Sequence, residues 1–322
     1  MPTFEQIVRA QRAKQLKWTR ASAKRIDTIL QNAARDTLVR LKEIAGTGSL
    51  EEAQKSAMLK SLTSTLETLK TDYGELMKLH LLGSSQIAAD RELQITGKLF
   101  NGAEFEQMTK GLRPEFARSA TIANIGEVAV TFGKVAERAV NIAFQRIYQD
   151  GLTLSDRLWR LDNTTRTVMQ DKVVGAIAKG TSARDLAKDL RSYLTEAGKG
   201  NARYNSMRLA RTEINTVHRE AHIQSCLDDK GELKEFISAV GWRLSASHPA
   251  QDICDVWASQ DINSLGRGNY LPKNVPVDHA LGLCLTVTLL KARPDLQFVT
   301  KEPDTTNVPP SQLKRYGIEE QP

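Results

Sequence analysis

Hydrophobic residues recur every three to four positions over most of the first 230 residues, which is the spacing of amphipathic helices. Residues 4–45 show this pattern without interruption. Over residues 59–80 the spacings alternate between three and four, which is typical of a coiled-coil seam about three heptads long. We expect Gly83-Ser84-Ser85 to end this seam. A third helical stretch covers residues 128–148 and ends at Gly151, so the sequence predicts long N-terminal helices.

After residue 155 the predicted elements become shorter. Lys179-Gly180 closes one helix, and Thr181 or Ser182 caps the next, because a hydroxyl at this position accepts a hydrogen bond from a free backbone N–H. Runs of β-branched and aromatic residues then indicate strands. We expect helices over residues 164–178, 183–194 and 202–227, and strands over residues 236–243 and 283–290.

Proline marks where the helical pattern stops. Of the ten prolines, eight lie at or after Pro249, and proline breaks helices because it lacks an N–H and its ring clashes with the preceding turn. The predicted fold class is mostly α: long N-terminal helices, partly coiled-coil-like, then a helical domain and a small α+β C-terminal segment. We place the long-helix region at residues 1–150, a second domain at 151–300 whose α+β part begins near 235, and a Pro-rich extended arm at 301–322.

The composition limits the classes of protein that fit. Hydrophobic residues make up 40% and charged residues 26% of the chain, so it can bury a core and is not intrinsically disordered. No stretch approaches the roughly 20 unbroken apolar residues of a membrane helix, and we expect no membrane partner. Three cysteines are too few for a disulfide scaffold in a chain of 322 residues.

The positive charge is concentrated near the N-terminus. The chain carries a net charge of +7, and residues 1–50 alone carry +6, from ten Lys and Arg against four Asp and Glu. Such a helix face can dock on an acidic protein surface, bind the phosphates of a nucleic acid, or remain a solvated face. The candidate partner-binding residues are Arg9, Arg12, Lys14, Lys17, Arg20, Lys24 and Arg25.

Two histidines and two cysteines in the Pro-rich end are candidate metal ligands. His248 precedes Cys254 by six residues and His279 precedes Cys284 by five, so that a short loop can fold each pair onto one ion. Two His and two Cys complete the tetrahedral coordination of a structural Zn²⁺, and its binding would help a short, loop-rich segment to stay folded. The alternative is that both cysteines are small buried hydrophobes and both histidines cap turns. We expect no required cofactor, and a structural Zn²⁺ is the one candidate.

A second grouping, His218, His222 and Cys226, lies along one face of the predicted helix over residues 202–227. Histidines at i and i+4 can share a metal, but a zinc-protease motif needs a glutamate directly after the first histidine, and here Glu220 stands two positions along. We therefore expect this stripe to pack against the next domain.

The sequence contains only incomplete versions of known catalytic motifs. Asp278-His279 would suit a metal-dependent nuclease, but no further histidine follows it. Cys254 and His279 are the residue types of a thiol protease, without an oxyanion signature. We assign no catalytic residue and expect a protein that binds rather than an enzyme. The alternative is a metal-dependent hydrolase or nuclease that uses His248, Asp252, Cys254, Asp255, Asp278 and His279.

The order of these motifs resembles that of the phage head morphogenesis family, the Mu F-like minor head proteins of tailed bacteriophages. The resemblance rests on Arg211-Thr212-Glu213 in a predicted helix, Trp242 in a predicted strand, and the His248…Cys254 and Pro276…His279…Cys284 clusters that follow. It covers residues 155–290, less than half of the chain.

This resemblance implies a virion component that is added with the portal during head assembly in the host cytoplasm and lies in the capsid interior or at the portal vertex. Its implied partners are the portal protein, the major capsid or scaffolding protein, and packaged DNA. It implies a role in DNA packaging or ejection and no small-molecule substrate.

Overall fold

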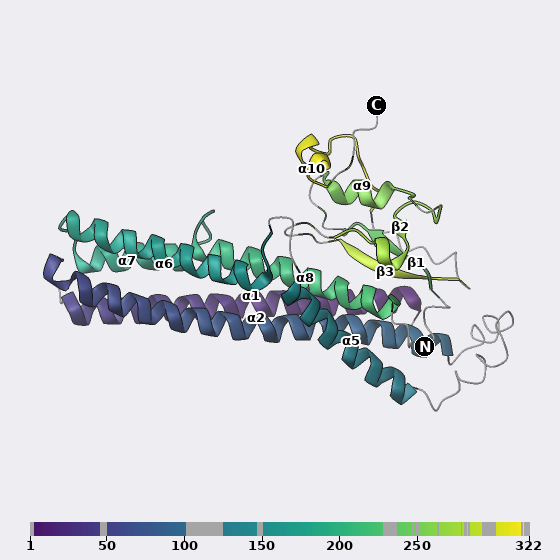
Figure 1. Ribbon diagram of the computed structural model, residues 1–322, viewed down its shortest axis with the longest axis horizontal. Helices are drawn as coiled ribbons and strands as arrows, with labels where there is room; N and C mark the ends of the chain where they lie inside the picture. The colour runs from purple at the N-terminus through teal and green to yellow at the C-terminus, as the bar shows by residue number, and fades with distance from the viewer. Residues whose placement is uncertain are drawn as a thin grey trace. The chain divides into compact units, whose positions relative to one another are not determined.

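The computed structural model describes residues 3–45, 50–100, 125–146, 151–227, 237–246, 248, 251–262, 264–277, 279, 282, 284–291, 301–316 and 318 (Figure 1). Its long helices are α1 (Phe4–Ala45), α2 (Lys55–Phe100), α5 (Ile125–Gln145), α6 (Leu154–Ala178), α7 (Ala183–Thr195) and α8 (Ala202–Leu227). The C-terminal elements are β1 (Ile237–Arg243), α9 (Ile253–Ser259), β2 (Asn269–Tyr270), β3 (Leu285–Leu290) and α10 (Pro310–Arg315), and short 3-10 helices cover Glu52–Gln54 and Pro272–Asn274. The predicted fold class, mostly α with a small α+β C-terminal segment, is confirmed.

The chain packs into two compact units that interleave along the sequence. Unit 1 contains Met1–Gln15, Leu82–Val140 and Asn215–Pro322, and unit 2 contains Leu16–Leu81 and Asn141–Ile214. The sequence analysis instead placed successive regions with boundaries near residues 150 and 300. Composition and proline content do not indicate which distant helices pack together. The predicted regions therefore follow one another along the chain, whereas the observed units interleave.

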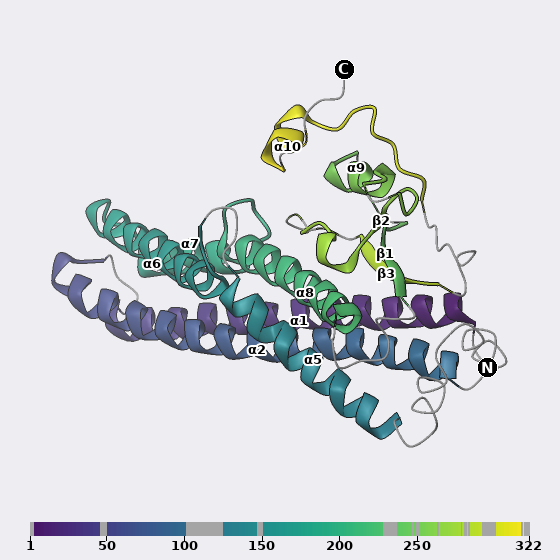
Figure 2. The same cartoon turned by 45° about the vertical axis from the view of Figure 1, so that its right-hand side comes forward.

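Unit 2 is a helical body. Its fully buried side chains include Ile26 of α1, Met58 of α2 and Met169 of α6, and α6 and α7 lie side by side (Figure 2). The buried hydroxyl of Tyr73 donates a hydrogen bond to the backbone oxygen of Ser206 at 2.7 Å, which links α2 to α8 within this unit. None of the described helices combines the length and the apolar composition that crossing a membrane requires.

The predicted break in the second long helix is wrong, because α2 runs through Gly83-Ser84-Ser85 without interruption. Ser84 and Ser85 are fully buried. The Ser85 hydroxyl donates to the backbone oxygen of Leu82 at 2.9 Å, which satisfies it inside the helix. The small residues that indicated a break instead serve close packing.

Caps set the bounds of α6 and α7. Thr153 and Asp156 form a capping box at the start of α6, so this helix begins at Leu154 rather than at 164. Gly180, with a φ of +63°, follows its end as predicted. Ser182 caps α7, as one of the two predicted candidates, and its hydroxyl accepts a hydrogen bond from a backbone N–H at 3.1 Å.

Unit 1 contains an antiparallel sheet with the strand order β2-β1-β3. Val240 of β1 pairs with Tyr270 on one side and with Thr288 on the other. β1 and β3 fall within the two predicted strands, whereas β2 and α9 were not predicted. Leu285, Val287 and Leu289 of β3 join one apolar core, and the alternate residues Thr286 and Thr288 make polar contacts.

A second core of unit 1 surrounds Trp242 of β1. The ring of Trp257 from α9 meets it edge-on at 5.0 Å, and the ring of Tyr316 meets Trp257 at 5.1 Å. Tyr316 belongs to the segment that was expected to be an extended arm, yet this segment contains α10 and packs on the core. Leu313, Tyr316 and Ile318 of this segment pack against the core around Trp242.

Candidate functional site

A capped helical turn places His248, Cys254 and Asp255 close together after β1. Asp252 is the N-cap of α9: its Oδ1 accepts a hydrogen bond from the backbone N–H of Cys254 at 2.7 Å, and its own N–H donates to Asp255 Oδ2 at 3.0 Å. This capping box fixes the first turn of α9. The N–H of His248 donates to the carbonyl of Ser245 at 2.9 Å, so a tight turn leads from β1 toward α9.

Helix α8 holds the backbone that leads into β3. Asn215 Nδ2 donates to the carbonyl oxygen of Gly282 at 2.8 Å, and Arg219 Nη2 donates to the carbonyl oxygen of Cys284 at 2.9 Å. The guanidinium of Arg219 also lies 5.0 Å from the ring of Trp242. These contacts hold Cys284 at the start of β3, with its side chain buried.

The four predicted metal ligands form two close pairs. His279 Nε2 is 3.1 Å from Cys254 Sγ, and Cys284 Sγ is 3.7 Å from His248 Nδ1. The thiol of Cys254 donates a hydrogen bond to the sulfur of Cys284, which joins the two pairs. The sequence analysis paired each histidine with the cysteine of its own loop, whereas these close contacts pair each histidine with the cysteine of the other loop. Asp278 lies outside the described residues.

Aspartates contact both histidines of this cluster. His248 Nε2 is 2.8 Å from Asp255 Oδ2, and His279 Nε2 is 3.2 Å from Asp252 Oδ2. Asp255 is only 1% exposed, and its Oδ1 accepts a hydrogen bond from the backbone N–H of Asp304 at 2.9 Å. The sequence analysis named the two carboxylates only in the hydrolase alternative; here each contacts an imidazole and also accepts a backbone N–H.

The C-terminal segment contributes to the same site. Lys301 Nζ donates to the carbonyl oxygen of His248 at 3.0 Å. Gln312 Oε1 accepts a hydrogen bond from the backbone N–H of Ile253 at 3.0 Å. With Asp304, these residues tie the segment to the histidine loop and to the first turn of α9.

Hydrogen bonds shift the pKa of two groups in the cluster. The hydrogen bond from Cys254 outweighs burial and lowers the pKa of Cys284 below its ordinary value of 9.0, with help from the backbone N–H of Ser245. Burial alone would raise the pKa of Asp252, but the hydrogen bond with His279 and its charge together lower it. Both shifts favour the anionic form of the side chain.

The thiols of the cluster are buried, whereas His279 and Asp252 are partly exposed. Cys254 is fully buried, and Cys284 and His248 are 2% and 6% exposed. In a Cys-His-Asp triad the thiol and the carboxylate contact different nitrogens of the imidazole. Cys254 and Asp252 both contact Nε2 of His279. Cys284 and Asp255 do contact different nitrogens of His248, but this thiol is only 2% exposed. The arrangement suits the holding of a cation better than nucleophilic catalysis.

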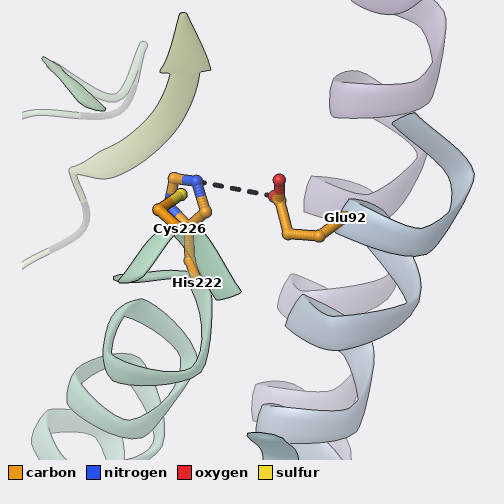
Figure 3. Close-up of side chains that lie close together, drawn as sticks. All are labelled: Glu92, His222 and Cys226. Atoms are coloured by element: carbon orange, nitrogen blue, oxygen red, sulfur yellow. Dashed lines mark ion pairs between the residues drawn. The ribbon is translucent and has the colours of Figure 1, made fainter. Parts of the chain in front are cut away.

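A second buried cluster joins α2, α8 and β3 within unit 1. Figure 3 shows Glu92 of α2 facing His222 and Cys226 of α8, with 3.5 Å between Glu92 Oε1 and His222 Nε2. The side-chain donor atoms of these three residues lie within 4.8 Å of one another. The sequence analysis grouped His222 and Cys226 with His218, whose buried Nε2 has no hydrogen-bond partner among the described residues. No spacing signal links Glu92 to α8.

The hydroxyl of Thr288 contacts all three side chains of this second cluster. Its Oγ1 donates to Glu92 Oε2 at 2.8 Å and lies 2.8 Å from His222 Nε2 and 4.0 Å from Cys226 Sγ. Arg91 supplies a positive charge, since its Nε donates to Glu92 Oε1 at 2.7 Å. These contacts form a buried hydrogen-bonded network that ties β3 to two helices.

The seven predicted partner-binding cations of α1 fall into two groups. Arg9 forms an ion pair with Glu5 at 2.6 Å, and Arg12 Nη1 donates to Gln15 Oε1 at 2.5 Å. The others are exposed, and none of them forms an ion pair with a carboxylate of the described residues. They are Lys14, Lys17, Arg20, Lys24 and Arg25.

Comparison of the chain with protein-family models, with curated proteins and with solved structures gives no match.

Proposed function

We propose that this protein is a minor head protein of a tailed phage that joins the portal vertex during head assembly and acts by binding. The observation that carries the proposal is the order of elements from α8 to β3. Arg211-Thr212-Glu213 precedes Trp242 of β1, and the His248…Cys254 and His279…Cys284 clusters follow. This is the order that resembles the Mu F-like family, and the residues after β1 form one compact cluster.

Two features support binding rather than turnover. Both thiols of the His-Cys-Asp cluster are buried, which does not suit a nucleophile that must meet a substrate. On α1, five exposed cations lie on a stretch that contains no carboxylate between Gln6 and Ile26. An unneutralised cationic face attracts an acidic protein surface or a phosphate backbone.

The portal protein is the partner that we propose first, with the major capsid or scaffolding protein and packaged DNA as further contacts. The protein would then lie in the capsid interior or at the portal vertex, after assembly in the host cytoplasm. A role in DNA packaging or ejection follows from that position.

Co-purification with the portal protein encoded in the same genome tests this proposal. We expect the tagged chain to retain the portal through size-exclusion chromatography, and cryo-EM of heads made with and without the chain to differ at the portal vertex. Absence of the chain from both precursor and mature particles would overturn the proposal.

A metal-dependent hydrolase or nuclease is the second candidate, favoured by one observation. His279 and Asp252 have side chains that are 22% and 17% exposed, so one edge of the cluster reaches the surface. The purified protein would then cleave DNA or peptide with Mg²⁺, Mn²⁺ or Zn²⁺ and lose this activity on His279→Ala. Failure of every metal to give turnover would remove this candidate.

A further inference from the structure

We propose that His248, Cys254, His279 and Cys284 bind one Zn²⁺, that Asp255 orients the first of these ligands, and that the C-terminal segment from Lys301 completes the site. This inference rests on the geometry of unit 1 and is independent of the proposed phage function.

The donor types fit tetrahedral zinc, and so do the donor distances within each of the two His-Cys pairs. Zn–N and Zn–S bonds of about 2.0 to 2.3 Å place donor atoms of a tetrahedron roughly 3.4 to 3.8 Å apart. The distances of 3.1 Å between His279 Nε2 and Cys254 Sγ and of 3.7 Å between His248 Nδ1 and Cys284 Sγ lie close to this range. Two thiolates also neutralise the charge of Zn²⁺, which suits a buried site.

His248 carries the clearest signature of a ligand. Its Nε2 is 2.8 Å from Asp255 Oδ2, so the N–H of that nitrogen donates to the carboxylate and the lone pair of Nδ1 points toward Cys284. A carboxylate that holds the far nitrogen of a metal-binding imidazole is a recurring feature of zinc sites. Backbone N–H groups of Asp252 and Asp304 hold the Asp255 carboxylate in turn.

The contacts of Asp252 assign it a different role. Its Oδ1 accepts the backbone N–H of Cys254 at 2.7 Å as the cap of α9, and its Oδ2 faces His279 at 3.2 Å. A zinc set of Asp252, Cys254 and His279 would leave out the buried Cys284, whose sulfur lies 3.7 Å from His248 Nδ1. We therefore infer two sulfur ligands rather than one.

Cys284 has a supporting contact of its own. Arg219 Nη2 donates to its carbonyl oxygen at 2.9 Å, and the same guanidinium lies 5.0 Å from the ring of Trp242. Such contacts hold a ligand in place. Arg219 and Trp242 connect the site to α8 and β1, so that metal binding would contribute to the folding of unit 1.

Metal analysis and cobalt spectroscopy of the full-length chain test the proposal. We expect one zinc per chain after purification without added chelator. After exchange into Co²⁺ we expect the strong visible bands of a tetrahedral ion and a near-ultraviolet thiolate-to-cobalt band with the intensity of two thiolates. Wild-type protein that takes up neither metal would overturn the proposal, and so would a spectrum with one thiolate.

The third cysteine provides a matched control. Cys254→Ser and Cys284→Ser should each lower the zinc content at least tenfold, while Cys226→Ser, which changes an equally buried thiol in the Thr288 network, should leave it at one. Asp252→Asn should keep both the stoichiometry and the cobalt spectrum. Equal loss of zinc from Cys226→Ser and Cys284→Ser, or loss from Asp252→Asn, would contradict the assigned ligand set.

Asp255→Asn tests the orienting role, with an expected loss of about 10- to 100-fold in zinc affinity and an unchanged cobalt spectrum. Because the cysteine variants could fail to fold, the wild-type chain provides a further measurement: addition of a chelator should lower its Tm by at least about 5 °C. A Tm insensitive to the chelator would count against the site. None of these results affects the portal-binding assay, so the two proposals fail separately.

Discussion

His222 Nε2 lies 2.8 Å from the hydroxyl oxygen of Thr288, so that side chains of α8 and β3 meet inside unit 1. The same hydroxyl donates to Glu92 of α2. One small side chain therefore joins two helices to the sheet, at a place where each polar partner is buried. Glu92 also accepts from Arg91, and His222 also contacts Thr286.

Thr288→Val tests this role, because valine keeps the shape of threonine and removes the hydroxyl. Glu92 and His222 would each lose a hydrogen bond inside the protein, and a buried polar group left unsatisfied costs about 1 to 3 kcal/mol. We expect the free energy of unfolding, from urea titration, to fall by about that amount. Thr288→Ser retains the hydroxyl and serves as the control; equal stability of the two variants would refute the role.

The stability of unit 1 should depend on pH through its buried histidines. Burial first, and then the charge of Arg91, lower the pKa of His218 and of His222 well below 6.5. In the unfolded chain both titrate near 6.5, so the unfolded state binds more protons below that pH. Stability is then lost as the pH falls, by up to about 1.4 kcal/mol per pH unit for each histidine.

Urea titrations at about pH 7.5 and about pH 5.5 measure this loss. A chelator in both series keeps any metal released at acid pH from contributing. His222→Gln removes one titrating group and should reduce the difference between the two pH values. A variant with the full pH dependence of the wild type would show that other groups cause it.

Gly268 should tolerate no side chain. Its φ is +65°, and a Cβ at this position would lie 2.6 Å from the carbonyl oxygen of Ala258. We expect Gly268→Ala to lower the free energy of unfolding by at least about 2 kcal/mol, because the backbone strain adds to this steric clash. Gly175→Ala is the matched control: its Cβ meets nothing within 4 Å inside α6, so it should stabilise by up to about 1 kcal/mol. Thermal unfolding of both variants checks the contrast.

The cationic face of α1 should carry partner binding. Reversal of Lys17, Arg20 and Lys24 to Glu should weaken portal or duplex DNA binding at least tenfold at low salt, since these side chains are exposed and no described carboxylate neutralises them. For DNA, the slope of log K against log salt should fall by about 0.9 for each phosphate that the variant no longer neutralises.

The control for this experiment makes the same change of charge elsewhere. Glu replaces three exposed lysines of the α6–α8 region, Lys179, Lys188 and Lys199. Circular dichroism should show unchanged helix content in both triple variants. Equal loss of binding from the two would indicate an effect of net charge, not of the α1 face.

Much of the secondary structure was determined by the sequence, because its causes act over a few residues. The hydrophobic spacing predicted the long helices, Ser182 caps α7 as a predicted candidate, and β-branched runs located β1 and β3. Two wrong helix bounds have local causes too. The Thr153 capping box starts α6 ten residues before the predicted position, and α2 continues through Gly83-Ser84-Ser85, where the two serines are buried.

Which distant residues meet was decided only by the tertiary structure. Residue types and spacing identified His248, Cys254, His279 and Cys284, but the antiparallel sheet and the turn into α9 determine that His248 faces Cys284 and His279 faces Cys254. The hydrogen bond between Glu92 and Thr288 joins residues 196 positions apart and has no local pattern. Such pairs form when packing brings separate elements together, and a sequence records only the elements.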